Sequence, residues 1–201
     1  VVQLDHFPES NRQPVGHIID IVGAASDPGI EVQVAVRTHD LPYQFSEEAM
    51  AQAKAFGDTI DAQTANSRLD LRDLPFVTID GEDAKDFDDA VCATPRGKNG
   101  WTLWVAIADF AHYVTDNSPL DQTAIERGTS VYFPSEVIPM LPETLSNGLC
   151  SLNPHVDRLA LAVCLEIAST GRVTKYRFHE VVFQSQQRLT YNQVQDALDA
   201  V

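Results

Sequence analysis

Residues 76–93 read FVTIDGEDAKDFDDAVCA. Apolar residues dominate both ends of this stretch, FVTI and AVCA, and the pattern predicts two strands. Between them, residues 80–89 hold six carboxylates and one lysine. Two carboxylates about 4 Å apart repel by roughly 4 kcal/mol at an effective dielectric constant of about 20, so acids that converge need protons or a cation. The stretch therefore predicts either a cation site at the edge of a sheet or a solvated acidic loop.

Four aspartates in this stretch have a spacing that suits a divalent-cation site. Asp80 ends the first predicted strand, and Gly81 permits a sharp turn directly after it. In an extended chain Asp86 and Asp88 share a face, and a bend before the second strand lets Asp89 reach the same point. Oxygen ligands without Cys or His favour Mg²⁺, or Mn²⁺, over zinc, and two such ions about 3.5–4 Å apart suit in-line attack on a phosphodiester. The EF-hand pattern D-x-[DN]-x-[DN]-G begins at neither Asp80 nor Asp86, so that type of site is not predicted.

Alternating apolar residues predict further strands on both sides of these acids. In the front part they cover residues 14–23 and 30–37. Further along, the apolar run 101–108 predicts a strand that is buried on both faces. A strand pair at 159–168 and 173–185 follows. The order of elements indicates a β-rich front piece followed by a mixed α+β domain.

Three helices are predicted from the residues at their ends. Residues 46–57 and 118–128 each begin with a serine suited to the N-cap and end in glycine. A third helix begins at Thr190 with a capping-box pattern. The polar residues 58–73 between the front piece and the first acidic strand predict a linker.

Composition excludes several classes of protein. The 201 residues carry 14 Lys and Arg against 29 Asp and Glu, a net charge of −15, so a basic nucleic-acid coat and a polybasic membrane anchor are not expected. No apolar run approaches the roughly 18 residues that a membrane helix needs. Three cysteines without a CxxC pair argue against a disulfide framework and a thiolate zinc site, and favour a reducing, cytoplasmic setting.

Further motifs follow the acids in order along the chain. They are LWVAIADFAHYV, RGTSVYFPSEVIPMLPETLSNGLCSLNP and VDRLALAV, and together with TIDGEDAKDFDDAV they extend across residues 71–196. In this combination they resemble the catalytic RNB domain of the RNase II/RNase R exoribonucleases. The motif sequences are closer to those of the RNase R branch. The front piece, VGHIIDIVG followed by IEVQVAVRTHDLPY, resembles the end of the second cold-shock, OB-type domain of that family.

The resemblance implies an α+β fold class: the end of an OB-type β-barrel followed by the first half of an RNB catalytic domain. Residues 1–57 would be the C-terminal part of the cold-shock domain with a connecting helix, residues 58–73 a linker, and residues 74–201 the N-terminal part of the catalytic domain. Nothing in the sequence matches the later HFTSPIRR-like block of the family or its basic S1 domain. We therefore expect a piece of a longer protein, with little nuclease activity alone.

The resemblance also implies an activity: processive, Mg²⁺-dependent hydrolysis of single-stranded RNA from the 3′ end, with release of nucleoside 5′-monophosphates. Mn²⁺ is an alternative ion. The four catalytic aspartates of the family fall on Asp80, Asp86, Asp88 and Asp89, with Asp80 and Asp89 expected as the first metal ligands. The longer protein is expected to be a monomeric cytoplasmic enzyme that binds neither a membrane nor DNA.

Two tyrosines match family aromatics that contact RNA. Tyr132 lies in SVYFP and Tyr191 in LTYNQV. Stacking of a base on an aromatic ring is worth about 1–3 kcal/mol and tolerates any base, which suits an enzyme that moves along RNA. The alternative for Tyr132 is ordinary core packing.

Other polar residues have simpler expected roles. Asp109 is predicted as a buried, hydrogen-bonded acid, Arg158 as a contact to a phosphate or to a loop, and His112 as a core or boundary residue. The serines of the PETLSNGLCSLNP motif have no Ser–His–Asp pattern. Two further functions stay open: a non-catalytic RNA-binding or interaction module of the same fold, and a Mg²⁺-dependent phosphatase or other phosphoryl hydrolase.

Overall fold

The computed structural model describes residues 1–8 and 10–200, which form two compact units. The first unit comprises Val1–Gln44 and Ser130–Ile138, and the second begins at Phe45 and holds the rest of the chain. Within the described residues no helix is both long and apolar enough to cross a membrane.

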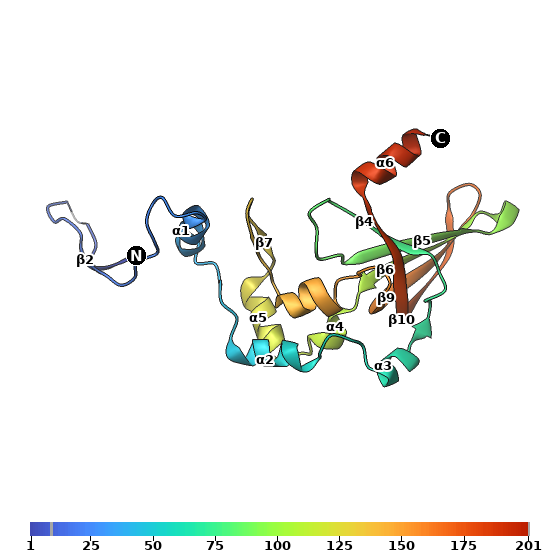
Figure 1. Ribbon diagram of the computed structural model, residues 1–201, viewed down its shortest axis with the longest axis horizontal. Coiled ribbons are helices and arrows are strands. Elements are labelled where there is room, and N and C mark those ends of the chain that lie inside the picture. Colours follow the sequence, from blue (N-terminus) through green and yellow to red (C-terminus); the bar gives the residue numbers. More distant parts are fainter. Residues whose placement is uncertain (9, 201) are drawn as a thin grey trace. The chain divides into compact units, whose positions relative to one another are not determined.

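The first unit contains two small antiparallel strand pairs and one helix (Figure 1). The strands β1 and β2 form one pair, β7 and β8 form the other, and α1 lies between them in the sequence. Their bounds are Val2–His6 for β1, Val15–Ile18 for β2, Ile30–Thr38 for α1, Val131–Tyr132 for β7 and Val137–Ile138 for β8. The strand predicted at 14–23 is thus present over its first half.

The strand predicted at 30–37 is wrong, because these residues form α1. Gly29, with φ 79°, precedes the helix in a conformation that glycine adopts without strain. Val32 and Val36 are four residues apart and are buried against Ile138, whereas Val34 is 51% exposed. An i, i+4 pair buried on one side is a helical contact, and it prevails over the alternation of apolar residues.

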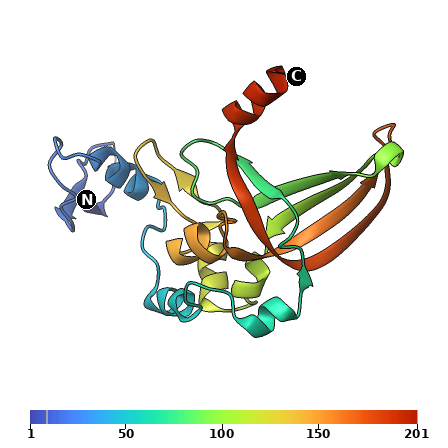
Figure 2. The same cartoon turned by 45° about the vertical axis from the view of Figure 1, so that its right-hand side comes forward.

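The second unit is built on a six-stranded sheet of order β3-β10-β4-β5-β6-β9. The long strand β10 also pairs with β9, so the sheet returns on itself, and Figure 2 shows β10 curving along it to the last helix. The bounds are Leu69–Asp70 for β3, Phe76–Asp80 for β4, Asp89–Pro95 for β5, Trp101–Ala108 for β6, Asp157–Ile167 for β9 and Val173–Thr190 for β10. The strands predicted in this unit are all confirmed.

One face of the sheet is buried and the other is partly open. Small side chains of β5, β6 and β9 pack with two phenylalanines of β4 and β10 on the buried face, among them Phe76, Cys92, Ala106, Ala160, Ala162 and Phe183. Residues of β6 on the opposite face are more exposed, 51% for Trp101 and 46% for Ile107. The prediction that residues 101–108 are buried on both faces is therefore wrong, since neighbours cover only one face.

Helices cover one end of the second unit (Figures 1 and 2). Residues of α2, α5 and η2 form a second core cluster with Leu159 of β9 and Val182 of β10. Two helices of this unit lie elsewhere: η1 is in the hairpin between β5 and β6, and α6 follows β10. The bounds of all the described helices of the unit are α2 Glu47–Ala55, α3 Ala62–Asn66, η1 Gly97–Asn99, α4 Phe110–Tyr113, α5 Pro119–Arg127, η2 Thr144–Leu149 and α6 Tyr191–Asp199.

The three predicted helices are confirmed, together with their caps. The hydroxyl of Ser46 accepts from the backbone N–H of Ala49, and Thr190 and Gln193 form the predicted capping box. Residues 58–73, predicted as a linker, contain α3 and the two-residue strand β3, which joins the edge of the sheet beside β10. The α+β fold class is confirmed.

Candidate active site

Asp80 lies at the carboxyl end of β4, where the buried face of the sheet meets the acidic loop. Alternate residues of a strand share a face, so Asp80 follows the fully buried Phe76 and Thr78 on the same side. Within the part of the chain that the structure describes, its buried Oδ2 atom has no hydrogen-bond partner. An unpartnered buried carboxylate oxygen is costly unless a proton or a cation meets it.

The other three predicted acids come from the loop and from the start of the next strand. Asp86 is partly buried and Asp88 exposed in an irregular segment, and Asp89 is the first residue of β5, paired with Ile107 of β6. Burial raises the pKa of Asp80 above its usual 3.8, and the charges of Asp89, Asp88 and Asp86 raise it further. Burial and the charge of Asp88 also raise the pKa of Asp89. The structure therefore brings the four acids into one electrostatic group.

This group fits a divalent cation by its chemistry. Its donors are carboxylate oxygens, one of them is buried and unpartnered, and the acids repel one another, so a cation would offset both costs. In residues 1–8 and 10–200, no group of three or more His, Cys, Asp or Glu side chains has an arrangement that could hold a metal ion. Asp80 and Asp89, the two with raised pKa values, are the strongest candidates to hold Mg²⁺ or Mn²⁺.

Arg188 of β10 supports the acidic loop from the neighbouring strand. Its guanidinium donates to the backbone carbonyls of Gly81, at 3.0 Å, and Glu82. The same group lies 5.0 Å from the ring centre of Phe87 and lowers the pKa of Asp80 by its charge. Sequence reasoning missed this residue, because nothing in its local pattern distinguishes it from other basic residues of β10.

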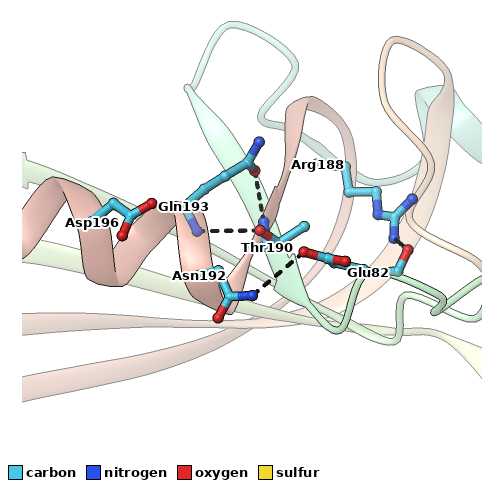
Figure 3. A pocket seen from close by; sticks show the side chains of 6 residues that line it. All are labelled: Glu82, Arg188, Thr190, Asn192, Gln193 and Asp196. Atoms are coloured by element: carbon cyan, nitrogen blue, oxygen red, sulfur yellow. Dashed lines mark hydrogen bonds between the residues drawn. The ribbon is translucent and has the colours of Figure 1, made fainter.

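A polar cleft of about 450 Å³ lies beside this end of β4. Figure 3 shows Glu82 and Arg188 on one side and the first turn of α6 on the other. The amide of Asn192 donates to Glu82 Oε1 at 3.4 Å. Thr190 pairs with Asp80 across the parallel strands, so the cleft borders the acidic group. Its lining consists of Glu82, Arg188, Thr190, Asn192, Gln193 and Asp196.

Neither predicted RNA-contacting tyrosine is part of a core. Tyr132, in β7 of the first unit, is 64% exposed, and Tyr191, the first residue of α6 in the second unit, is 62% exposed. The core-packing alternative for Tyr132 is therefore wrong, and contact of both rings with RNA stays a prediction. Tyr191 directly follows Thr190, so it is close in the chain to the pairing partner of Asp80.

The remaining polar residues have structural roles. Asp109 accepts from the backbone N–H of His112 and forms an ion pair of 2.6 Å with Arg68, and both side chains are largely buried. Arg158 donates through Nε to the carbonyl of Ser151 at 2.7 Å, so it holds a loop, the second of its two predicted roles. The ring of His112 packs edge-on against Tyr113 at 4.8 Å.

Comparison with protein families finds two matches. Residues 68–201 match the RNB domain and residues 1–46 match a cold shock domain. Ribonuclease R of Escherichia coli K12 is 50% identical over 194 residues, which cover 96% of this chain and 24% of that protein. Ribonuclease R of Acidithiobacillus ferrooxidans is 51% identical over 194 residues, with 96% of this chain and 44% of that protein covered. The chain thus spans from a quarter to less than half the length of these relatives.

Solved structures show the same fold. RNase R of Mycoplasma genitalium in complex with double-stranded RNA superposes with a TM-score of 0.90 at 32% identity, over 99% of this chain and 35% of that one. Yeast Ssd1, described as a pseudonuclease, superposes with a TM-score of 0.77 at 18% identity, over 98% of this chain and 25% of that one. At that identity the second likeness shows the fold alone.

Proposed function

Because the chain belongs to the RNB domain family, we propose that it forms part of a processive exoribonuclease that degrades single-stranded RNA from the 3′ end. The products would be nucleoside 5′-monophosphates. The match over residues 68–201 confirms the resemblance seen in the sequence, and the cold-shock match over residues 1–46 confirms the OB-type front piece.

The unpartnered Oδ2 atom of Asp80 carries this proposal. It is buried at the end of β4, and three further acids raise the pKa of its carboxyl group. A carboxylate held only for stability has a basic or hydrogen-bonding partner, whereas a carboxylate that binds a cation keeps an oxygen for it.

In the proposed mechanism the four aspartates have two different roles. Asp80 and Asp89 would be the first metal ligands, and Asp86 and Asp88 would complete the second ion site and orient the attacking water. Bound Mg²⁺, or Mn²⁺, would neutralise the charge that develops on the phosphate and activate that water. The water oxygen bonds to phosphorus, the bond to the 3′ oxygen of the preceding nucleotide breaks, and that oxygen takes a proton. The shortened RNA then ends in a new 3′-hydroxyl.

Two observations support the proposal that the protein binds RNA: the exposed aromatic rings and the structures of relatives solved with RNA. RNase R of Mycoplasma genitalium has been solved with double-stranded RNA and with ribose-methylated single-stranded RNA. We expect Tyr132 to contact RNA near its 3′ end, and Tyr191, which follows the strand beside Asp80, to help hold the last nucleotides. The expected setting is a monomeric protein in the cytoplasm, with no DNA partner.

Substitution of each acid by asparagine in the protein as its gene encodes it tests the proposal. Turnover is measured on a short RNA with a 3′-hydroxyl and on the same RNA with a 3′-phosphate, with analysis of the products. Release of mononucleotides from the 3′-hydroxyl substrate supports the exonuclease, and release of internal oligonucleotides only would exclude it. Full activity of Asp88→Asn would overturn the assignment of the four acids.

The alternative is a non-catalytic RNA-binding or interaction module of the same fold. It predicts RNA binding that persists after Asp80→Asn and no release of nucleotides from the unaltered protein. We also expect residues 1–201 alone to have little nuclease activity, because the chain spans only 24% of a full relative. Processive degradation of poly(A) by the isolated chain at normal rates would contradict this expectation.

A further inference from the structure

Residues 81–88, which connect Asp80 to Asp89, contain no helix or strand. The backbone groups of such a segment cannot bond within a ladder, so other parts of the fold must satisfy them where they are buried. The segment includes Phe87, whose side chain is buried in the core cluster of the sheet. The position of Asp86 therefore depends on how its two neighbours, Lys85 and Phe87, are held.

A single buried hydroxyl holds both neighbours of Asp86. The Ser151 Oγ–H donates to the carbonyl of Lys85 at 2.8 Å, and Ser151 Oγ accepts from the backbone N–H of Phe87 at 3.1 Å. Ser151 is fully buried. Water therefore does not compete for the buried bond to the Phe87 N–H, and loss of the hydroxyl would leave this N–H and the part-buried carbonyl of Lys85 without this partner.

Further hydrogen bonds hold the acidic segment and the chain around Ser151 in place. The backbone N–H of the next residue, Leu152, donates to the carbonyl of Phe87 at 2.8 Å. On the other side of the loop, Ala108 of β6 donates to the carbonyl of Asp88 at 2.8 Å. The Nε atom of the buried Arg158 donates to the carbonyl of Ser151. The acidic segment is thus tied to one buried point at residues 151–152 and to the end of β6.

We propose that Ser151 is a positioning residue that sets the Asp86 carboxylate for the cation by bonding the backbone on both sides of it. This inference rests on the proposed function, since it concerns the same acidic group. Ser151 does not touch the reacting atoms, and its role is to restrict the backbone at Lys85 and Phe87. A substitution that changes the partners of a metal ligand commonly costs 10- to 100-fold in metal affinity or activity.

The test compares Ser151→Ala with Ser185→Ala in the protein as its gene encodes it. Ser185 is the matched control, because it is a buried serine of β10 whose hydroxyl donates to the carbonyl of Gln187 at 3.2 Å, away from the acidic segment. Three quantities are measured for each variant: Tm, the Kd for Mn²⁺ alone by calorimetry, and kcat and KM on a short RNA. Both variants should lower Tm to a similar extent.

Only Ser151→Ala should weaken Mn²⁺ binding, by about 10-fold, and lower kcat by about 10-fold with little change in KM. Equal Mn²⁺ affinity and equal kcat in the two variants would reduce Ser151 to a structural role and overturn the proposal. If the protein proves not to be a nuclease, the Mn²⁺ measurement still decides whether Ser151 positions the acids. Failure of the proposed function and failure of the proposal for Ser151 can therefore be distinguished.

Amide hydrogen exchange of the unaltered protein tests the proposal without a variant that could misfold. The Phe87 N–H lies outside any strand, yet the two bonds of Ser151 predict that it exchanges as slowly as the Val91 N–H within β5. Exchange of the Phe87 amide as fast as that of the exposed Asp83 would show that the segment is not held, and would overturn the proposal.

Discussion

Asp80 and Asp109 occupy similar places in the sheet but have opposite surroundings. Asp80 ends β4 and Asp109 directly follows β6, and both strands pair with β5. Arg68 lies 2.6 Å from the Asp109 carboxylate, whereas Asp80 Oδ2 has no hydrogen-bond partner among the described residues and interacts with three other acids. An aspartate at a strand end is therefore a candidate ligand only where the fold itself does not neutralise it.

The largest expected effect separates the two residues by activity. Asp80→Asn should lower kcat on RNA by about 100-fold or more, because it removes a carboxylate charge from the cation site. Asp109→Asn should keep kcat within about threefold of the unaltered enzyme at a temperature where the variant is folded. Single-turnover cleavage of a short RNA measures both, and unchanged turnover in Asp80→Asn would remove the basis of the comparison.

The second prediction concerns the contribution of Asp109 to the free energy of unfolding, which Asp80 does not share. Asp109→Asn leaves the largely buried Arg68 guanidinium without its counter-charge, which should lower the free energy of unfolding by about 3–5 kcal/mol. Urea unfolding measures the loss. Addition of Arg68→Met to the same chain removes the orphaned charge and should restore most of the stability, whereas a loss below about 1 kcal/mol in Asp109→Asn alone would show that the pair is dispensable.

The sequence predicts which aspartates lie at strand ends, but not the residues that surround them. FVTID and WVAIAD are both apolar strands that end in aspartate, and the local pattern cannot tell which acid is neutralised. The deciding contacts come from far along the chain, since Ser151 is 64 residues from Phe87 and Arg188 is 107 residues from Gly81. Strand ends and helix caps depend on local residues and are therefore predictable. The alternation of apolar residues at 30–37 predicts a strand, and only the tertiary burial of Val32 and Val36 shows that the period is helical.

The third prediction concerns Arg188, whose positive charge lowers the pKa of Asp80. Arg188→Lys keeps the positive charge but removes the planar guanidinium, whose Nη2 atom donates to the carbonyls of both Gly81 and Glu82 and which lies 5.0 Å from the ring centre of Phe87. We expect kcat to fall by about 10-fold and the Mg²⁺ concentration for half-maximal activity to rise. Arg177→Lys, an exposed change on the same strand, is the control. Wild-type kinetics in Arg188→Lys would show that charge alone suffices there.

The smallest expected effect is a change in thermal stability whose sign differs between the two aspartates. Because the folded state raises the pKa of Asp80 above the ordinary 3.8, folding favours its protonated form, and the stability that it contributes is lost as pH rises through the folded pKa. Without divalent ions at pH 7, Asp80→Asn should therefore raise Tm, by about 1–3 °C, and the gain should vanish below pH 3.8.

Asp109→Asn should lower Tm under the same conditions, because its partner is a cation that the fold supplies. Addition of Mg²⁺ should then raise the Tm of the unaltered protein more than that of Asp80→Asn, since an ion that binds the native state stabilises it in proportion to its affinity. Differential scanning calorimetry across pH, with and without Mg²⁺, measures all three. If Asp80→Asn lowered Tm as Asp109→Asn does, Asp80 would have a stabilising partner in the fold, and the contrast between the two strand ends would be lost.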